Sequence, residues 1–600
     1  IAVPIFTVTG LYRNIFRYSG WPAIVMVSRA MSLYGIVFMT IVMMIGLDGT
    51  PRTIGLIQPI LLFLAVGSSR LFARFWLSPN YPISHQQNNL IKALVYGAGT
   101  AGRELVGTLK SGHEIRPVGF LDDDDSLHGH VLNGQTIFSP DDLGELIESK
   151  GITHVLMAIP SASRHRRNAI LKKMSRHHVA VRTLPSVTDL AAGRVTTSDL
   201  RDLDIDDLLG REAVAPNHIL LAKNISTRVV LVTGAGGSIG SELCRQIIRL
   251  KPEKILLVEI SEFALYTIHA ELEEIRQASG GSSVPQIVPL LASVQDGERI
   301  RDIMRAWLPL TVFHTAAFKH VSLVENNLIE GLKNNVIGTL TMAQVAIEVG
   351  ALDFVLISTD KAVRPSSGMG ASKRLAELCL QALSALQVEH SQNQIISSES
   401  GVKHREATQI TLSVVRFGNV LNSSGSVIPR FRKQIRDGGP ITLTHPEITR
   451  YFMTASEAAQ LVIQASAMAK GGEIFVLDMG EPVKIIDLAH RMIFHSGLSV
   501  RDEANPNGDI EILITGLGDG EKLHEELVLG DRCESTLHPK IMRALDPFVP
   551  WHDLEIELEA LKISLRSSEG EGALEVLQRL VAGYRPSEKI IELFCGDEMD

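Results

Sequence analysis

The stretch VVLVTGAGGSIG, residues 229–240, decides the fold of this chain. Apolar residues of high strand propensity run directly into a glycine-rich turn, and a helical pattern follows from Ser241. The glycines let the backbone turn tightly and approach a pyrophosphate, and the following helix N-terminus offers free N–H groups and positive potential. The stretch therefore predicts the first strand and helix of a doubly wound α/β domain that binds a dinucleotide. The glycine-turn residues that we expect to contact it are Gly234, Gly237, Ser238, Ile239 and Gly240.

The next strands supply further candidate cofactor contacts. Strands are predicted at 254–258, 287–291 and 311–314. The first ends at Glu259, about 20 residues past the last glycine, where a carboxylate accepts both ribose hydroxyls and repels a 2′-phosphate. This favours NAD over NADP. Asp296 follows the second strand as a candidate adenine partner, and the small Ala316 and Ala317 after the third let the backbone approach the cofactor.

A strand further along the chain carries the candidate chemistry. Residues 354–361, FVLISTDK, form an apolar run that ends in Thr359, Asp360 and Lys361. Ligands of open α/β sheets bind at the carboxyl ends of the strands, so an adjacent acid and base here indicate proton chemistry. A plain ion pair is the alternative interpretation.

An earlier glycine-rich unit precedes this domain. A predicted strand at 92–96 leads into GAGTAG, residues 97–102, and the acidic run 122–125 follows a second strand at 117–121. Further strands are predicted at 155–159 and 179–184. The pattern predicts a first Rossmann-like domain, for which a binding role and a purely structural role both stay open.

Two uncharged apolar runs near the start, residues 30–47 and 53–69, predict membrane-spanning helices, since a span needs about 20 apolar residues. Basic residues flank the pair, Arg13 and Arg17 before it and Arg70 and Arg74 after it, which predicts cytoplasmic flanks. The apolar opening, residues 1–10, is interpreted as the end of a further span whose beginning is missing.

Length and composition bound the remaining possibilities. A chain of 600 residues is too long to fold around a single hydrophobic core, so we expect several domains. Its net charge of −9 argues against a general nucleic-acid binder. The four cysteines form no Cys-x-x-Cys pair and the histidines no metal-ligand spacing, so we expect no metal site. We predict transmembrane helices at 1–77, Rossmann-like domains at 90–187 and 225–550 joined by a connector at 188–224, and a helical segment at 551–600.

Several motifs carry a family resemblance. They are TGAGGSIGSEL (233–243), HTAAFKHVSLVE (314–325), NNVIGT (334–339), STDKAVRPSSGMGASKR (358–374), VVRFGNVLNSSGSVIPRF (414–431), ITRYFMT (448–454) and GEKLHEEL (520–527). With them the chain resembles the extended short-chain dehydrogenase/reductase superfamily, and within it the long, membrane-anchored, CapD-like UDP-N-acetylglucosamine 4,6-dehydratases. Two departures from the superfamily pattern match this subgroup. Met369 stands where a Tyr-x-x-x-Lys motif has its tyrosine, and Lys361 stands where glucose-nucleotide dehydratases have glutamate.

The resemblance implies an extended dehydrogenase fold with a small substrate-binding lobe, and an NAD-dependent conversion of UDP-N-acetylglucosamine to a 4-keto-6-deoxy sugar. Its implied catalytic residues are Thr359, Asp360, Lys361, Met369 and Lys373, of which Lys373 also holds the nicotinamide ribose. Its implied substrate contacts are Lys319, Asn419, Arg450 and Glu521.

In the implied reaction Lys361 removes the carbon 5 proton, and Asp360 protonates the departing hydroxyl at carbon 6. The pKa of Lys361 must therefore fall, through desolvation or a positive neighbour such as Lys373, and the pKa of Asp360 must rise. The acceptor of the carbon 4 hydroxyl proton stays open, with Asp360 or a water as candidates.

The resemblance further implies a homo-oligomer that feeds polysaccharide synthesis from the bacterial cytoplasmic (inner) membrane, with the lipid bilayer as a partner and the catalytic domains in the cytoplasm. Two alternatives remain: a nucleotide-sugar 4-epimerase of the same superfamily, and a non-catalytic, membrane-tethered nucleotide-binding scaffold.

Overall fold

A computed structural model of the chain describes residues 21–45, 51, 53–77, 91–109, 115–160, 162, 164–174, 177, 179–183, 201–202, 216–278, 285–397, 409–503, 505–530, 532–567 and 570–595. The apolar opening, the predicted flank at Arg13 and Arg17 and most of the predicted connector lie outside these residues. The chain divides into two compact units, residues 1–90 and 91–600, which are described separately. The finer domain limits predicted from the sequence stay predictions.

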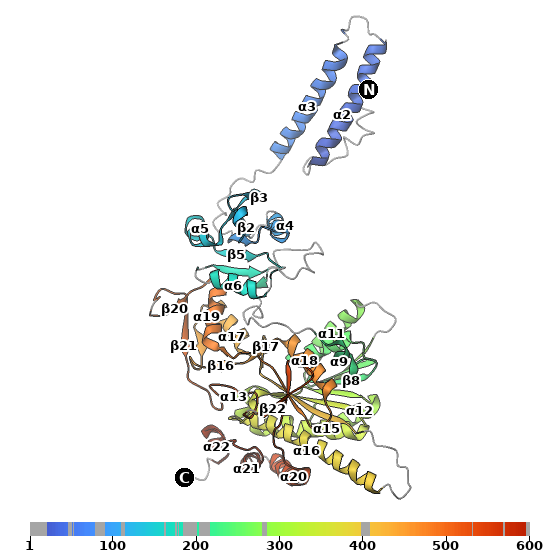
Figure 1. Cartoon of the computed structure of the whole chain (residues 1–600), viewed down its shortest axis with the longest axis vertical. Coiled ribbons are helices and arrows are strands. Elements are labelled where there is room, and N and C mark those ends of the chain that lie inside the picture. The colour runs from blue at the N-terminus through green and yellow to red at the C-terminus, as the bar shows by residue number, and fades with distance from the viewer. Residues whose placement is uncertain are drawn as a thin grey trace. The chain divides into compact units, whose positions relative to one another are not determined.

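The first unit contains two helices, α2 (Trp21–Ile45) and α3 (Ile54–Leu77), that pack side by side (Figure 1). Tyr34 of α2 donates a hydrogen bond of 2.8 Å to the side chain of Gln58 in α3. Within the described residues, no helix combines the length and the apolar character needed to cross a bilayer. The predicted membrane spans are therefore wrong, as are the bilayer partner and the multi-pass inner-membrane location that rested on them. A crossing needs about 20 apolar residues in a row, whereas α3 contains Gln58, Pro59, Arg70 and Arg74.

The second unit begins with the predicted first Rossmann-like sheet, whose strand order is β3-β4-β2-β1-β5-β6-β7. The strands β2, β1, β5 and β6 are mutually parallel, as the strand–helix alternation predicts. Its strands are β1 (Ile91–Tyr96), β2 (Ile115–Leu121), β3 (Val131–Leu132), β4 (Gln135–Phe138), β5 (His154–Met157), β6 (Ala180–Thr183) and β7 (Arg201–Asp202). Its helices are α4 (Thr100–Leu109), α5 (Leu143–Lys150) and α6 (Arg164–Met174).

The larger sheet has the strand order β10-β9-β8-β11-β12-β13-β18-β23-β22. Its first seven strands are parallel, and β23 and β22 close one edge antiparallel. The order reverses between β8 and β11, so the loops after these two strands diverge and leave a crevice at the carboxyl edge. The strands are β8 (Val229–Thr233), β9 (Lys254–Glu259), β10 (Gln286–Leu291), β11 (Thr311–His314), β12 (Asp353–Thr359), β13 (Thr411–Phe417), β18 (Ile474–Leu477), β22 (Cys533–Ser535) and β23 (Ile541–Ala544).

Helices cover both faces of the larger sheet because alternate side chains of its buried strands point to opposite faces. In β8, Val229 and Leu231 join one hydrophobic cluster, whereas Val230 and Val232 join the other. The first cluster includes residues of α12 (Gly297–Trp307), α14 (Leu328–Leu332), α15 (Gly338–Val349) and α16 (Gly368–Ser397). The second includes residues of α9 (His218–Lys223), α10 (Ser238–Arg249), α11 (Glu262–Ala278) and α18 (Ala455–Met468).

A small lobe with its own core follows β13, where the sequence pattern changes to loops and short helices. Its sheet has the order β15-β21-β20, and α17 and α19 pack on it. The elements are α17 (Val427–Arg436), β15 (Ile441–Leu443), α19 (Ile485–His495), β20 (Val500–Arg501) and β21 (Ile510–Ile514), with the short pairs β14 (Asn419–Val420) and β17 (Phe452–Met453), and β16 (Thr449–Arg450) and β19 (Val483–Lys484).

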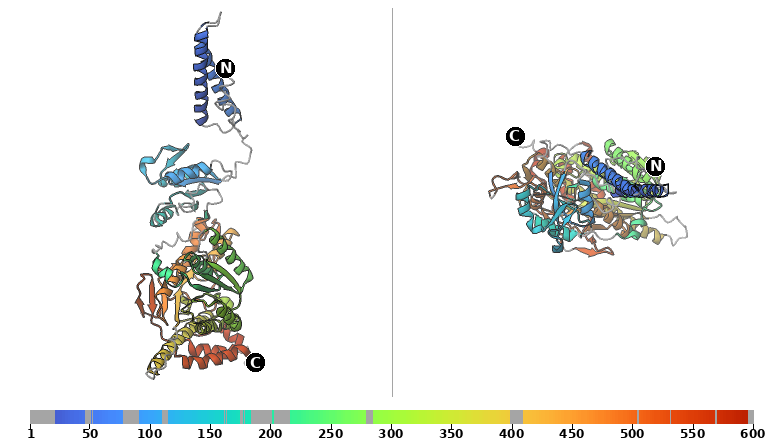
Figure 2. Two further views of the ribbon diagram at one scale, coloured as in Figure 1. Left: turned by 90° about the vertical axis from the view of Figure 1, so that its right-hand side faces the viewer. Right: turned by 90° about the horizontal axis from the view of Figure 1, so that it is seen from above.

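The C-terminal helices belong to the core of the same unit. Leu554, Leu558, Leu561 and Leu565 of α20 (Trp551–Ser567) are buried in the cluster that contains α16. Both α20 and α21 (Gly570–Leu580) contact α16 directly, and a last helix α22 (Glu588–Cys595) follows them (Figures 1 and 2). The sequence predicted a helical segment here but not its packing.

Candidate active site

The glycine turn after β8 brings helix α10 against the sheet edge. Gly234 has a φ of +62°, which favours glycine. A Cβ added to Gly240 would lie 2.1 Å from the Gly234 carbonyl oxygen, so the strand–helix approach requires glycine at both ends. The predicted contacts Gly237, Ser238, Ile239 and Gly240 line a cavity of about 860 Å³.

Glu259, at the end of β9, holds the glycine turn in place. Its carboxylate accepts hydrogen bonds from the backbone N–H of Gly236 at 3.0 Å, of Ile260 at 2.9 Å and of Ser261 at 3.1 Å. It also lines a neighbouring cavity of about 280 Å³, together with Gly234, Ala316 and Ala317.

Asp296, the predicted adenine partner, lies at the N-terminus of α12 and outside both cavities. It caps α12 by accepting from the Arg299 N–H at 3.0 Å, and the walls of the two cavities do not include it. Ser293 and Val294 line the smaller cavity in its place. Its adenine role stays a prediction.

A buried polar network supports the loop after β11. Thr233 and Thr339 both contact the ring nitrogens of the buried His314, at 2.8 and 3.0 Å. Burial and the charge of Lys373 lower the pKa of His314 to about 3, so the ring is neutral at pH 7. A neutral ring in this position orders the strand end without adding charge.

Asn335 is a structural residue of the site to which the sequence reasoning gave no role. Its amide accepts from the Phe318 N–H at 2.8 Å and donates at 3.0 Å both to the Phe318 carbonyl and to the Ser372 hydroxyl. It lies in a π-helical turn, Lys333–Ile337, within a longer helical run. Such turns often occur at functional sites. The motif NNVIGT contains it, but helical periodicity cannot reveal the extra residue in the turn.

The predicted Thr359 is the last residue of β12, and Asp360 and Lys361 follow it in a 3₁₀ turn, Asp360–Ala362. Thr359 donates from its hydroxyl to Asp360 Oδ1 at 2.9 Å, and Lys361 Nζ donates to the same oxygen at 3.1 Å. Thr359 and Lys361 line the larger cavity, whereas Asp360 is fully buried and is not part of its wall. Asp360 Oδ2 has no hydrogen-bond partner among the described residues. The Asp360 carboxylate is therefore buried beneath the cavity wall that Thr359 and Lys361 form.

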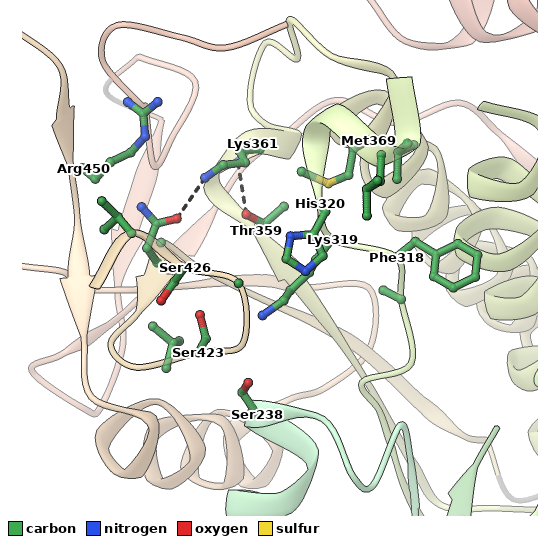
Figure 3. A pocket seen from close by; sticks show the side chains of 18 of the residues that line it. Ser238, Phe318, Lys319, His320, Thr359, Lys361, Met369, Ser423, Ser426 and Arg450 are labelled. Atoms are coloured by element: carbon green, nitrogen blue, oxygen red, sulfur yellow. Dashed lines mark hydrogen bonds between the residues drawn. The ribbon is translucent and has the colours of Figure 1, made fainter. Parts of the chain in front are cut away.

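Lys361 lies at the cavity wall (Figure 3), and three oxygen-bearing side chains surround its amine. Its Nζ donates to Asn419 Oδ1 at 3.1 Å and to Asp360, and lies 3.5 Å from Glu525 Oε1. Burial opposes the charge on Lys361, but the carboxylates of Asp360 and Glu525 outweigh it and raise the pKa. The sequence reasoning required a lowered pKa here and did not include Glu525 among the site residues.

Helix α16 contributes Met369 and Lys373 to the wall of the same cavity. Met369 is buried, and its thioether offers no exchangeable proton, unlike the tyrosine of a Tyr-x-x-x-Lys motif. Lys373 Nζ donates to the Ile357 carbonyl at 2.6 Å, and burial lowers its pKa to about 8. Lys373 therefore fixes α16 to the end of β12 and is more readily deprotonated than Lys361.

The small lobe supplies the opposite wall. All four predicted substrate contacts, Lys319, Asn419, Arg450 and Glu521, line the cavity, and Figure 3 shows Lys319 and Arg450 on different sides of it. Arg450 donates to Glu521 Oε1 at 3.1 Å and to the carbonyls of Thr449 and Leu523. The site thus combines a dinucleotide-type cradle, a hydroxyl–carboxylate–amine series and cationic side chains suited to an anionic ligand.

Comparisons with known proteins agree with this arrangement. A family described as Polysaccharide biosynthesis protein matches residues 230–546. The chain is 37% identical over 537 residues to the Capsular polysaccharide biosynthesis protein CapD of Staphylococcus aureus, covering 89% of this chain and 83% of that protein. At 28% identity it matches a UDP-N-acetylglucosamine 4,6-dehydratase (inverting) of Campylobacter jejuni over 54% of this chain and 84% of the relative. At 28% identity it also matches a UDP-glucose 4-epimerase of Rickettsia rickettsii over 50% of this chain and 77% of the relative.

Proposed function

Because the chain belongs to the polysaccharide biosynthesis protein family, as its motifs predicted, we propose that it is an NAD-dependent UDP-N-acetylglucosamine 4,6-dehydratase for cell-surface glycan synthesis. The observation that carries the proposal is the Thr359–Asp360–Lys361 series at a cavity that also holds the glycine turn and the tyrosine-replacing Met369. An acid and a base on adjacent residues suit an elimination, in which one group takes a proton from carbon and another protonates the departing oxygen.

The proposed cofactor site is the glycine turn with Glu259. The close approach of Gly240 to Gly234 leaves the N-terminus of α10 open to a pyrophosphate. The Glu259 carboxylate favours a free ribose over a 2′-phosphate, so NAD is preferred to NADP. NAD bound at the glycine turn and Glu259 would supply hydride transfer, from carbon 4 of the sugar and back to carbon 6. Calorimetric titration with each dinucleotide tests the preference.

Asp360 and Thr359 act on the two sugar oxygens in this proposal. Because Asp360 is buried behind Thr359, the Thr359 hydroxyl relays protons between the sugar and the carboxylate. As the 4-keto sugar forms, the carbon 4 hydroxyl gives its proton through Thr359 to Asp360. The same proton then returns through Thr359 to the departing carbon 6 hydroxyl, and water leaves. This route provides a proton acceptor where Met369 cannot.

Lys361 acts on carbon 5. It takes the proton that the neighbouring ketone makes acidic and returns it to carbon 5 when the hydride reaches carbon 6. Since Asp360 and Glu525 raise the pKa of Lys361, only the fraction of the protein whose Lys361 amine is neutral can take this proton, which predicts faster reaction at alkaline pH. Arg450 and Lys319 are the proposed contacts of the substrate diphosphate, because both are cations at the cavity wall. The predicted homo-oligomer stays a prediction.

The test is incubation of the purified chain with UDP-N-acetylglucosamine and NAD, without a reductant. The expected product is lighter than the substrate by one water and has a ketone at carbon 4 by NMR. A product of unchanged mass with inverted carbon 4 would indicate the epimerase instead. Met369 weighs against the epimerase, because it stands in place of the tyrosine whose hydroxyl such an enzyme would use. Absence of any 4-keto product would contradict the proposal, and absence of NAD binding as well would favour the non-catalytic scaffold.

A further inference from the structure

Lys361 lies between the cavity and two buried carboxylates. One is its chain neighbour Asp360, and the other is Glu525, which comes from the loop after the small lobe. The Glu525 side chain is 3% exposed, and its Oε1 lies 3.5 Å from Lys361 Nζ and 3.9 Å from Arg450 Nε. Its second oxygen, Oε2, has no hydrogen-bond partner among the described residues.

This environment is a poor one for a carboxylate with a purely structural role. Removing a carboxylate from water costs several kcal/mol unless nearby cations and hydrogen bonds compensate. Glu525 makes neither a bidentate pair nor a cap, and the cations it faces are Lys361 and Arg450. The charges therefore alternate in a line, Lys361, Glu525, Arg450 and Glu521, that begins and ends at the cavity wall.

We infer that Glu525 is a positioning residue for the proposed reaction: its carboxylate holds the Lys361 amine at the cavity wall and controls how readily that amine releases its proton. The inference rests on the proposed function, in which Lys361 removes the carbon 5 proton. It adds a residue that acts through Lys361 and that forms no part of the cavity wall itself.

The charged groups that face Lys361 are Asp360, Glu525 and Arg450, and the neutral Asn419 amide completes its contacts. Tyr451 faces Asp360 from the small-lobe side, and burial raises its pKa, so it is neutral at pH 7. Burial and Arg450 lower the pKa of Lys361, whereas the two carboxylates raise it. Replacing the Glu525 charge by a neutral amide therefore leaves a single carboxylate and lowers the pKa of Lys361. A close charge partner typically contributes about 1–3 pH units.

The first experiment measures the pH dependence of carbon 5 proton exchange with solvent deuterium, using UDP-N-acetylglucosamine and NAD. The wild type, Glu525→Gln and Glu526→Gln are compared. Glu526 is the matched control, since it is the next residue, half exposed, and pairs with Arg364 at 2.8 Å away from the site. We expect the acidic limb of the profile to move to lower pH by about 1 unit or more in Glu525→Gln. The Glu526→Gln profile should match the wild type. An unchanged limb in Glu525→Gln would overturn the inference.

A second experiment keeps the inference testable if Glu525→Gln is inactive. A small acylating reagent modifies neutral amines, and peptide mass spectrometry then gives the labelling rate of Lys361 against pH without turnover. The exposed Lys251 serves as the internal reference. The labelling midpoint of Lys361 should fall in Glu525→Gln and stay unchanged in Glu526→Gln. An equal midpoint in wild type and Glu525→Gln would overturn the inference even if the enzyme is active.

The two readouts also separate this inference from the proposed function. If the wild type forms no 4-keto sugar, the proposed function fails, while the labelling experiment still reports whether Glu525 controls the Lys361 proton.

Discussion

Lys361 is the residue on which the proposed reaction depends most. It contacts Asp360, Asn419 and Glu525 through one nitrogen and still lines the cavity. A side chain held by three oxygens has few alternative rotamers, so its nitrogen is already placed for proton removal.

Replacing Lys361 by methionine should abolish carbon 5 exchange and dehydration, because no other described side chain bonded to Asp360 is an amine. General-base removal typically costs a factor of about 10²–10⁴ in rate. The measurement is deuterium incorporation at carbon 5 by mass spectrometry, alongside calorimetric binding of NAD, which should persist. Lys484→Met is the control, since Lys484 is an exposed lysine paired with Glu447. Residual exchange at the wild-type rate in Lys361→Met would assign the base elsewhere.

At this scale the sequence brought candidate site residues together but could not say which of them line the cavity. Thr359, Lys361, Met369 and Lys373 line the cavity, as does each predicted substrate contact. Asp360 does not, because it begins a 3₁₀ turn in which its side chain is fully buried, and a position at the end of a strand does not reveal that turn. Glu525 was missed because its role depends on a contact across 164 positions of the chain, which the GEKLHEEL motif does not reveal.

At the scale of elements, the two glycine turns of the chain have the same close packing. A Cβ on Gly102 would lie 1.9 Å from the Gly97 carbonyl oxygen, and a Cβ on Gly240 would lie 2.1 Å from that of Gly234. In each turn, a carboxylate at the end of the next strand accepts a hydrogen bond from a backbone N–H of the turn. Asp122 accepts from Ala98 at 2.7 Å, and Glu259 accepts from Gly236 at 3.0 Å. The glycine pattern and its acid were predictable because they reflect local backbone needs.

Gly240→Ala should separate α10 from β8 and weaken NAD binding by at least about tenfold, since the new methyl cannot fit against the backbone. Calorimetry measures the affinity, and thermal unfolding the accompanying loss of stability. Gly107→Ala is the control: it lies in helix α4, where an added Cβ meets nothing within 4 Å, so stability should hold or rise by about 1 kcal/mol. Unchanged NAD affinity in Gly240→Ala would contradict the proposed cofactor site.

Most strand positions also followed from the sequence pattern, whereas the strand order did not. The predicted strand 311–314 coincides with β11. The membrane helices were the failure at this scale. Hydrophobic runs alone do not define a span, because length and interruption by polar residues also count.

Across the second unit, a buried ionic cluster joins segments that are far apart in the chain. Arg416 of β13 pairs with Glu377 of α16 and with Asp546 after β23, and Ser358 of β12 donates to Glu377 at 2.6 Å. The Arg416 and Glu377 side chains are completely buried. The cluster therefore fixes the strand that carries the reacting residues to the helix that carries Lys373.

Glu377→Gln should destabilise the fold by about 3–5 kcal/mol, because it leaves the buried Arg416 charge partly uncompensated. Burial opposes the Glu377 charge, but Arg416 and Arg374 outweigh it and lower the pKa below the model-peptide value of 4.5. The stabilisation is therefore present above pH 4.5 and is lost as pH falls below it. Urea unfolding at pH 7 and near pH 4 measures both effects, and in Glu377→Gln this acid-dependent loss should shrink. Equal unfolding free energies for the two proteins at pH 7 would refute this account.

The C-terminal helices contribute to the same core, and a matched pair of residues tests this. Leu561→Ala should cost about 2–5 kcal/mol, since Leu561 is fully buried in the cluster that includes α16. Ile563→Ala should change stability by less than about 0.5 kcal/mol, because Ile563 is 63% exposed on the same helix. Chemical denaturation of both variants gives the comparison, and similar losses would show that α20 does not complete the core. The sequence could not reveal this packing, because an amphipathic helix does not identify its partner.

That packing has a consequence for how the protein is made. During synthesis, α16 leaves the ribosome long before α20 and α21, whose leucines cover it. Strand β23, which pairs with β18, also arrives late. Until those segments emerge, the nascent sheet has an uncovered apolar helix and an unpaired edge, both of which promote aggregation. We therefore expect this chain to require chaperone protection while it is being translated, and the catalytic unit to close only when its last helices are released.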